Sequence, residues 1–333
     1  MLRRTGGYKL TEKLVSRCMQ IYTLRPGACR SGEIGRRAGF KIPFWQQSDG
    51  SSPSSGTIIP MKNIHLMSFN RILIMLFAFY AAVGFSTNIS AWGEDGHAAV
   101  GILSLERLQA DAGIELQRIL GSLDEQTLVE VCNWPDTVKK TEEWAWSYPL
   151  HFVNIPKGAS SYSKSRDCPD QLCATEAIKR YAAELGDRKA SMEKRRQAFA
   201  WICHLTGDLH QPLHAGYSGA AYDKGGNNVA VTFAGEQTNL HYFWDSALIE
   251  SRTSGLQQLI GVLSRFPVVQ AGDDWSAGMA DRWTDESHQL VQQEIYPQDP
   301  VITQSYADKS WEIMQQRVTT AASHLALIVN TVL

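Results

Sequence analysis

The sequence has no apolar run long enough to cross a membrane as a helix. A spanning helix needs about 20 consecutive apolar residues, and the longest run here covers only residues 72–85 (ILIMLFAFYAAVGF). That length is typical of the core of a signal peptide, which has about 7–15 apolar residues. Lys62 and Arg71 provide the basic region ahead of it, and Ala91 ends a small-residue cleavage point. We therefore interpret residues 61–91 as a signal peptide, with an uncleaved anchor as the alternative.

The remainder of the chain, residues 92–333, lacks an excess of basic side chains. Residues 1–91 hold 12 of the 32 Lys and Arg residues and 3 of the 34 Asp and Glu residues, so residues 92–333 carry 20 basic and 31 acidic side chains, a net charge of −11. Proteins that clamp duplex nucleic acid electrostatically are normally basic. The charge argues against such a clamp, although bound divalent cations would offset much of it locally.

Residues 1–60 lack helical or strand periodicity, and they are basic and rich in Gly and Ser. Met61 is the natural start of the signal peptide, and the segment before it resembles a reading frame run through a transfer-RNA gene. We interpret residues 1–60 as a mis-annotated gene start, with a disordered basic extension as the alternative. Residues 92–333 contain no Asn-x-Ser/Thr acceptor, which favours a bacterial exported protein, periplasmic or secreted.

Four of the six cysteines lie in residues 92–333. Cys168 and Cys173 flank a four-residue loop, PDQL, and in an exported protein we expect a disulfide there. Cys132 and Cys203 each lie beside a candidate metal-binding motif. We favour buried thiols for these two, while a second disulfide or, less favoured, zinc ligation are the alternatives.

Apolar residues at three- and four-residue spacing over most of residues 92–333 predict an all-α fold. Asn228–Phe233 is typical of a strand and Leu150–Ile155 less so, which would fit a small hairpin or extended loops. No repeat or linker divides residues 92–333, so we expect a single domain with a substantial core. The expected helices lie near residues 94–110, 112–121, 135–146, 171–186, 191–211, 239–264, 272–295 and 306–331.

His204 and Asp208 lie four residues apart in the segment Trp201–His214 (WICHLTGDLHQPLH). That spacing places both side chains on one face of a helix. We expect the helix to end near Gln211, because the next residue is a proline, and His214 to turn back toward the same face. Imidazole nitrogens and carboxylate oxygens are common zinc ligands. A core helix with polar residues on its exposed side is the alternative.

The same residue types recur in four other short motifs. They are WGEDGH with His97, NWPDTVK with Asp136, LHF with His151, and NLHYFWD with His241 and Asp245 at the same four-residue spacing. Together the motifs offer more side-chain donors than the four that one tetrahedral zinc accepts. We therefore predict two or three metal ions that share a carboxylate. We expect His210 to support a ligand or to pack in the core, His288 and His324 to lie on the surface or in the core, and Gly225, Gly226 and Asn227 to set loop geometry.

These motifs resemble those of the zinc-dependent single-strand nucleases and 3′-nucleotidases, the S-one/P-one nuclease family. The resemblance covers essentially all of residues 92–333, including GMADRWTDESHQLVQQEIY and the C-terminal AASHLALIVNTVL. It implies a multi-helix domain like that of zinc phospholipase C, with three zinc ions in a cleft. In that family, signal cleavage makes a tryptophan N-terminal, and its α-amine and carbonyl bind one metal.

The resemblance implies a ligand set for each of the three zinc ions. The first ion would be held by Asp136, His151, His204 and Asp208; the second by His214, His241 and Asp245; and the third by Trp92, His97 and the shared Asp208. An α-amine titrates near pH 8 and can act as a neutral ligand, whereas an amide nitrogen is a poor donor. Cleavage directly before Trp92 would therefore be a chemical requirement.

The implied reaction is phosphodiester hydrolysis by a hydroxide held between zinc ions, with Asp136 and Lys139 as catalytic residues. Lys139 would lie near the phosphate, Phe152 would stack a nucleobase, and Asn154 would contact the base edge. An exposed helix lysine and a core aromatic are the alternatives for Lys139 and Phe152. The implied substrates are single-stranded DNA and RNA, cut to 5′-nucleotides, and 3′-nucleotides. No stable protein partner, and no membrane after signal cleavage, is implied.

Two other functions remain as alternatives. A zinc-dependent phospholipase C also uses an N-terminal tryptophan and three zinc ions, but His97 follows Trp92 by only five residues and the last ligand is Asp245 rather than a glutamate. A non-catalytic zinc-binding protein is less favoured, because structural zinc sites are closed and rich in cysteine. These sites are built from His and Asp, with room for water.

We expect the exported protein to begin at Trp92, because only a free α-amine can serve as the third metal's ligand. N-terminal sequencing and intact mass of the exported protein test this directly. A mature chain that begins at any other residue would remove that ligand.

Overall fold

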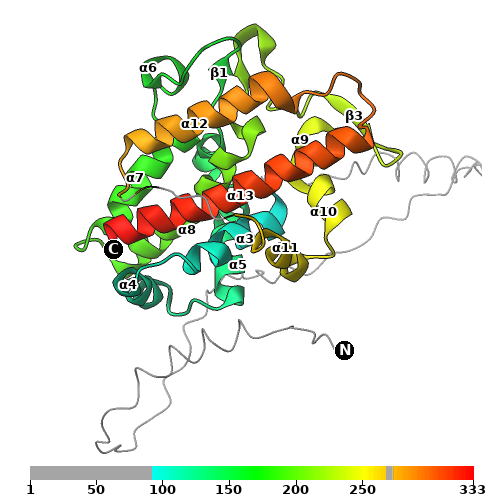
Figure 1. Cartoon of the computed structure of the whole chain (residues 1–333). Helices are drawn as coiled ribbons and strands as arrows, with labels where there is room; N and C mark the ends of the chain where they lie inside the picture. Colours follow the sequence, from blue (N-terminus) through cyan, green and yellow to red (C-terminus); the bar gives the residue numbers. More distant parts are fainter. Residues whose placement is uncertain (1–91, 268–271, 273) are drawn as a thin grey trace, which may run out of the picture. The chain divides into compact units, whose positions relative to one another are not determined.

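Helices make up most of the described part of the chain, which confirms the all-α prediction (Figure 1). This computed structural model describes residues 92–267, 272 and 274–333, and all of them fall within one compact unit. The predicted extension at 1–60 and signal peptide at 61–91 lie outside the described residues, so both stay predictions.

The elements follow one another in a chain of mostly short connections. In order, those of the first half are α3 (Gly93–Leu105), α4 (Ala110–Leu120), α5 (Glu125–Val138), the 3₁₀ helix η1 (Ala145–His151), β1 (Ile155–Pro156), α6 (Lys164–Asp167) and α7 (Ala174–Gly186). The middle of the chain contains α8 (Met192–His210), the 3₁₀ helix η2 (Pro212–Ala215), β2 (Tyr217–Ser218), the 3₁₀ helix η3 (Gly219–Ala221), β3 (Ala230–Phe233) and β4 (Glu236–Asn239). The remaining elements are α9 (Leu240–Tyr242), the π-helical turn η4 (Phe243–Ala247), α10 (Leu248–Arg252), α11 (Leu256–Leu263), α12 (Gly278–Leu290), the π-helical turn η5 (Val291–Ile295) and α13 (Gln304–Val332).

Helix α8 lies at the centre of the core. Its N-terminus is capped by Ser191, whose side chain accepts a hydrogen bond from the Lys194 backbone N–H, and the helix ends two residues before Pro212, as predicted. Every residue from 198 to 210 is buried, which is typical of a helix surrounded by other elements on all sides. Helices α3, α5, α7 and α13 pack against it, so polar side chains of α8 face neighbouring helices rather than water.

Helix α13 covers one side of this core. Figure 1 shows α13 (red) running past α12 (orange), and α13 packs on α3, α8 and α7. Thr303 caps its N-terminus by accepting the Tyr306 backbone N–H, and the helix is buried continuously from Arg317 to Val329. A helix this long therefore fixes the positions of several shorter ones, including α3 and α8.

Several predicted segment boundaries were wrong, and the helix expected near residues 239–264 is divided into α9, η4, α10 and α11, with residues 253–255 outside any helix. The helix expected over residues 135–146 is instead α5, which begins at Glu125 behind the Asp124 cap and ends at Val138. Pro135 lies inside α5 rather than at its start, because the neighbouring helices hold the backbone in place despite the missing donor. The weak strand at Leu150–Ile155 is also wrong for most of its length, since η1 continues to His151 and only Ile155 pairs in a strand.

The predicted hairpin is present. Strand β3 lies within the expected Asn228–Phe233 segment and pairs antiparallel with β4. The turn between them contains Ala234 and Gly235, both in the left-handed region, which glycine adopts without steric cost. The hairpin leads directly into α9, so it positions the start of the NLHYFWD motif.

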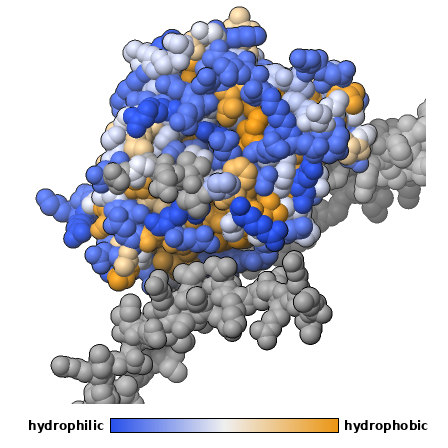
Figure 2. All heavy atoms as spheres, in the orientation of Figure 1, coloured by the Kyte–Doolittle hydropathy of each residue, from blue (hydrophilic) through white to orange (hydrophobic). Residues whose placement is uncertain are grey.

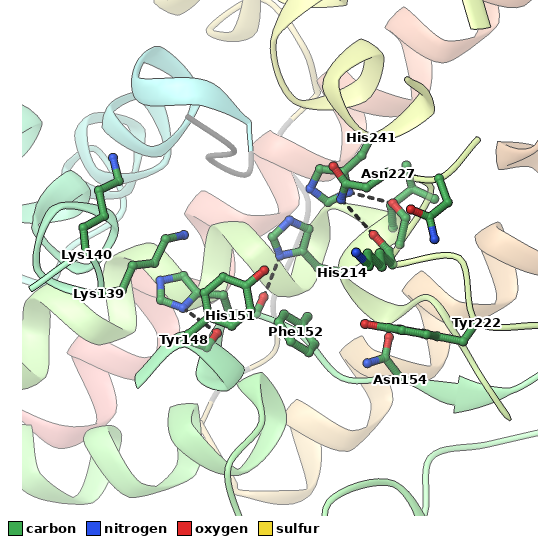
Figure 3. Close-up of a pocket in the computed structure, with 14 residues that line it drawn as sticks. Lys139, Lys140, Tyr148, His151, Phe152, Asn154, His214, Tyr222, Asn227 and His241 are labelled. Carbon is green, nitrogen blue, oxygen red and sulfur yellow. Dashed lines mark hydrogen bonds between the residues drawn. The ribbon is translucent and has the colours of Figure 1, made fainter. Parts of the chain in front are cut away.

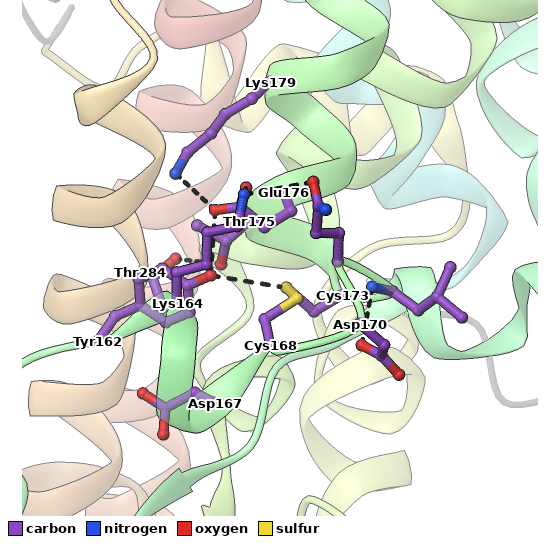
Figure 4. The surroundings of a disulfide bond; sticks show 12 residues. Tyr162, Lys164, Asp167, Cys168, Asp170, Cys173, Thr175, Glu176, Lys179 and Thr284 are labelled. Carbon is purple, nitrogen blue, oxygen red and sulfur yellow. Dashed lines mark hydrogen bonds and ion pairs between the residues drawn. A yellow bond between two sulfur atoms is a disulfide. The ribbon is translucent and has the colours of Figure 1, made fainter.

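The structure contains the expected disulfide between Cys168 and Cys173 (Figure 4). It also contains a second disulfide, between Cys132 and Cys203, so the expectation of two buried thiols was wrong. The two residues are 71 apart in sequence, but α5 and α8 pack together and bring their Cα atoms to 5.3 Å. That separation is within the range that a disulfide spans.

Large apolar side chains are rarely exposed. The face shown in Figure 2 is mostly hydrophilic, with hydrophobic residues in small separate areas. The most exposed large side chains among the described residues include Ile114, Trp146, Tyr148 and Tyr222. Within the described ranges, none of the helices has the length and hydrophobicity that crossing a membrane requires.

Candidate metal centre

The eight side chains predicted to bind metal come from seven elements and converge in the core. They are His97 on α3, Asp136 on α5, His151 on η1, His204 and Asp208 on α8, His214 on η2, His241 on α9 and Asp245 on η4. All eight are buried, and His97, His204 and Asp208 are 0% exposed. Ionisable side chains are almost never fully buried unless they are paired or bind a metal.

The first group of donors surrounds His204. The His204 Nε2 atom lies 3.4 Å from Asp136 Oδ1 and 3.4 Å from Asp208 Oδ2. The His151 Nε2 atom is 3.6 Å from the same Asp136 oxygen, and the His97 Nε2 atom is 3.4 Å from Asp208 Oδ1. Donor atoms of these residues lie within 4.8 Å of one another in two overlapping sets of three. Asp208 therefore faces both His97 and His204, as the shared carboxylate was predicted to do.

The second group consists of His214, His241 and Asp245, whose donor atoms also lie within 4.8 Å of one another. The His241 Nε2 atom is 2.9 Å from Asp245 Oδ2, and the rings of His214 and His241 stack at 5.1 Å. Asp245 lies in the π-helical turn η4, which widens the helix by one residue between the α9 and α10 segments. The Gln211 amide nitrogen donates to Asp245 Oδ1 at 2.5 Å and orients that carboxylate.

Backbone carbonyls orient four of the imidazole rings. A carbonyl oxygen only accepts, so the ring Nδ1 next to it carries the proton, and Nε2 presents its lone pair to the centre. The four Nδ1 contacts are His204 to Cys132 O at 2.9 Å, His214 to His151 O at 2.6 Å, His241 to Gly225 O at 2.7 Å and His151 to Tyr148 O at 3.2 Å. This arrangement is typical of histidines that bind a metal.

The absence of hydrogen-bond partners for many of these donor atoms also indicates a metal site. Buried polar atoms almost always have a hydrogen-bond partner, yet many of the predicted ligand atoms have none. Among the described residues, 13 buried side-chain atoms lack a partner, and 8 of them belong to predicted ligands. They are both ring nitrogens of His97, the Nε2 atoms of His151, His204 and His214, both carboxylate oxygens of Asp208, and Asp245 Oδ2. Cations bound in the two groups would satisfy these atoms except His97 Nδ1, because only the Nε2 atom of that ring faces Asp208.

Burial sets the protonation of the site. It lowers the pKa of His97 and His151 well below the ordinary value, and that of His214 to about 4. These imidazoles are therefore neutral at pH 7, which is the form that binds a metal. Burial also raises the pKa of Asp208 to about 8. Such a carboxyl becomes ionised at neutral pH only when a cation lies beside it.

Gly207 allows His97 to approach α8. A Cβ atom at this position would lie 2.8 Å from His97 Nδ1, closer than packed atoms come. The His97 ring has no room to retreat, because it stacks on His204 with 3.8 Å between ring centroids. The Gly207 carbonyl accepts the Trp92 indole N–H at 2.9 Å, which holds Trp92 against α8 one residue from Asp208. The proposed backbone ligation by Trp92 stays a prediction.

A cavity of about 660 Å³ opens onto the two groups (Figure 3). Its lining includes the predicted substrate residues Lys139, Phe152 and Asn154. Figure 3 shows Lys139 beside His151 on one side and Tyr222 close to Asn154 on the other, with His214 between them. The described lining residues comprise three lysines, three histidines, three asparagines, three aromatics, Leu213 and Gly225, and none is acidic.

Sequence reasoning missed several residues of this cavity. Tyr148 and Tyr222 are 57% and 49% exposed and line it with Lys224. Lys224 has a positive φ of 58° and directly precedes the two glycines that were predicted to shape this loop. Gly225 is required there, because a Cβ atom would lie 2.6 Å from the Leu213 carbonyl oxygen. The DKGGNN motif accounts for the unusual backbone conformation of Lys224, but the motif does not predict that Lys224 lies on the cavity wall.

The three remaining histidines of the described residues are buried away from the cavity. His210 Nε2 and His324 Nδ1 lie 2.8 Å apart, and the His324 ring stacks on Trp283. His288 Nδ1 donates to the Ala215 carbonyl at 2.8 Å. These contacts fit a packing role for His210 and the core alternative for His288 and His324.

Comparison with known proteins identifies the family. The model of the S1/P1 nuclease family matches residues 92–333. The chain belongs to this family. Among its relatives, Endonuclease 2 of Arabidopsis thaliana is 31% identical over 255 residues, which are 72% of this chain and 82% of the relative. Endonuclease 3 of the same plant is 36% identical over 48% of this chain and 55% of the relative, and Nuclease P1 of Penicillium citrinum is 33% identical over 49% and 60%.

For the last two relatives, the chain matches little more than half of their length. The S1/P1 nuclease family is zinc-dependent, and the His and Asp groups above match that requirement in donor type. The family resemblance found in the motifs is thus confirmed.

Gly207→Ala should weaken metal binding, because the added methyl group displaces the His97 ring that faces Asp208. We expect a drop of about 10–100-fold in zinc affinity, as for residues that orient metal ligands. Zinc content after dialysis against a graded chelator measures it. Gly113→Ala is the control, since its Cβ atom would meet nothing closer than 3.9 Å. Equal zinc retention by the two variants would contradict the close approach.

Proposed function

We propose that this chain is an exported, zinc-dependent nuclease that hydrolyses single-stranded DNA and RNA to 5′-nucleotides and removes phosphate from 3′-nucleotides. The observation that carries the proposal is the cavity at the metal groups. It is lined by lysines, asparagines and aromatic rings and by no acidic residue, although residues 92–333 carry a net charge of −11. A ligand with negative charge and flat rings matches that lining.

Three zinc ions account for the donors better than one or two. Asp136, His151, His204 and Asp208 would hold the first ion, and His214, His241 and Asp245 the second. The third would be held by His97, by Asp208 as a shared ligand, and by the backbone amine and carbonyl of Trp92. The support for this assignment is the number of converging donors that lack a hydrogen-bond partner, because a tetrahedral zinc uses four ligands or three and a water.

When bound, zinc ions supply the positive charge that makes water nucleophilic at neutral pH and that stabilises a departing oxygen. The side chains of the cavity then bind and orient the phosphodiester. Lys139 is the principal cation on one wall: its ammonium contacts Asp136 Oδ1 and lies 6.0 Å from the centre of the Tyr148 ring. We propose that Lys139 binds a phosphate oxygen and that Asp136 binds both the metal and this lysine.

Aromatic and amide side chains would bind the base. The Phe152 ring meets Tyr148 edge to face at 5.7 Å, and both line the cavity beside Asn154. A ring stacks on any base, whereas the Asn154 amide both donates and accepts hydrogen bonds. A base inside the cavity must be unpaired to reach Phe152, because the partner strand of a duplex would occupy the space of the walls. This geometry supports a preference for single strands.

Export agrees with the oxidised state of the chain. The described residues contain two disulfides, which persist in oxidising compartments such as the periplasm or the exterior. We therefore assign the protein to one of those two locations. Release from the membrane would follow cleavage of the predicted signal peptide.

The proposed activity is tested with purified protein on single-stranded DNA and RNA, duplex DNA, a 3′-nucleotide and phosphatidylcholine. We expect 5′-mononucleotides from the single strands, slower cleavage of the duplex, and phosphate from the 3′-nucleotide. EDTA should abolish each activity and added zinc should restore it. Release of phosphocholine alone would favour a phospholipase, and full activity without metal would contradict the zinc mechanism.

Phe152→Ala should raise KM for single-stranded DNA about 5–150-fold, because stacking contributes about 1–3 kcal/mol per base. The value of kcat should change little, since the backbone carbonyl of His151 still holds His214. Trp146→Ala is the control: Trp146 is also exposed on η1, but it does not line the cavity. Steady-state kinetics on an oligonucleotide measure both variants, and an equal rise in KM would exclude a specific role for Phe152.

A further inference from the structure

The buried disulfide Cys132–Cys203 lies beside the first metal group. Cys132 precedes Asp136 by four residues on α5, so both lie on one face of that helix. Cys203 directly precedes His204 on α8. Both cysteines are 0% exposed. The covalent bond therefore joins the two helices at the level of their predicted ligands.

The same two helices also share non-covalent contacts that depend on their spacing. The His204 Nδ1 atom donates to the Cys132 carbonyl at 2.9 Å, and the His204 Nε2 atom lies 3.4 Å from Asp136 Oδ1. Cys132 thus acts twice: its sulfur fixes the distance between α5 and α8, and its carbonyl sets the tilt of a ligand ring. A shift of α5 away from α8 would change both contacts together.

A third helix meets the disulfide at Gly101. A Cβ atom on Gly101 would lie 2.6 Å from Cys132 Sγ and 3.2 Å from Cys203 Sγ. Gly101 follows His97 by four residues on α3, and the His97 ring stacks on His204. Helices α3, α5 and α8 therefore all touch at the two sulfur atoms, and each carries a predicted ligand within one turn of that point.

The contact with Gly101 leaves little free space around the two sulfur atoms. Unbonded sulfur atoms stay farther apart than bonded ones, and the backbone of Gly101 closes one side of the space. Reduction would therefore push α5 and α8 apart in a core that is otherwise close-packed. Neither oxygen of Asp208 has a hydrogen-bond partner among the described residues, so no hydrogen bond at this carboxylate resists that movement.

We propose that the Cys132–Cys203 disulfide is a positioning element of the metal centre, so that tight zinc binding by the first group requires its oxidation. This inference rests on the proposed zinc site. The newly made, reduced chain would hold zinc weakly and would gain the full centre only where disulfides form. The second group (His214, His241 and Asp245) lies on η2, α9 and η4, outside the three helices that meet at the sulfurs, and should be affected less.

The other disulfide supplies a matched control. Cys168 and Cys173 are only 5 residues apart and lie next to Tyr162 at the start of α7 (Figure 4). Neither belongs to a helix that carries a predicted metal ligand. Removing this bond takes away a disulfide without changing the spacing of α5 and α8.

The test compares zinc binding by Cys132→Ala/Cys203→Ala and Cys168→Ala/Cys173→Ala in the processed, exported protein. Elemental analysis after a graded chelator challenge gives zinc per chain, and a coloured chelator gives the release rate. We expect the first variant to lose the ions of the first group about 10–100-fold more readily and to keep the second group, while the control matches the wild type. Equal zinc retention by all three proteins would overturn the proposal.

A second measurement covers the case in which the first variant does not fold. The folded wild type is treated with a water-soluble phosphine, which gives two electrons to the disulfide and takes the oxygen of one water, while the two protons of that water complete the thiols. Zinc should be released as the Cys132–Cys203 bond is lost, and mass spectrometry monitors that loss. The circular dichroism signal of the helices should persist. Complete reduction without zinc release, or release only as the helices melt, would overturn the proposal.

The outcomes also separate this inference from the proposed function. If the oxidised wild type bound no zinc, the proposed nuclease mechanism would be wrong. An oxidised wild type that binds zinc, with an affinity that reduction does not alter, removes only the role of the disulfide.

Discussion

The structure depends on one electrostatic constraint, the burial of Asp208 at the centre of the helical core. Its side chain is 0% exposed, and neither carboxylate oxygen has a hydrogen-bond partner among the described residues. An isolated ionised carboxylate in such a place is very costly, and burial raises the pKa of Asp208 to about 8, so this side chain is ionised at pH 7 only with a cation beside it. Burial keeps the imidazoles of His97 and His214 uncharged, whereas the carboxylates of Asp208 and Asp136 raise the pKa of His204 against the effect of burial.

Charge is distributed unevenly between the cavity wall and the rest of residues 92–333. Acidic side chains predominate over residues 92–333, while the cavity wall holds Lys139, Lys140 and Lys224 and no described acidic residue. The carboxylates of the site do not line the cavity, so in the proposed site they would bind metal without facing the ligand. A phosphate can therefore approach bound cations through the cavity without meeting an uncompensated negative charge.

The grouping of three candidate ligands was predictable from sequence because their spacing is local. His204 and Asp208 lie one helical turn apart, and Pro212 ends α8 where His214 must turn back, so neighbouring residues alone define this part of the site. The Cys132–Cys203 bond was not predictable, since it follows from the packing of α5 on α8 across 71 residues. Tyr148 and Tyr222 were missed for the same reason: the local sequence does not show that an exposed tyrosine lines the cavity, because the wall is formed by segments far apart in the chain. The start of α5 was predicted wrongly because tertiary packing outweighs the local preference of Pro135 for the first turn of a helix.

Four of the metal-facing histidines are held by main-chain oxygens, those of Tyr148, His151, Cys132 and Gly225. Every amino acid supplies such an oxygen, so the support itself depends on the path of the backbone and not on the supporting side chain. Inserting or deleting a residue nearby moves it. Relatives of this protein should therefore keep the number of residues between each support and its histidine, and of the four supports only Tyr148 has no other role that fixes its residue type.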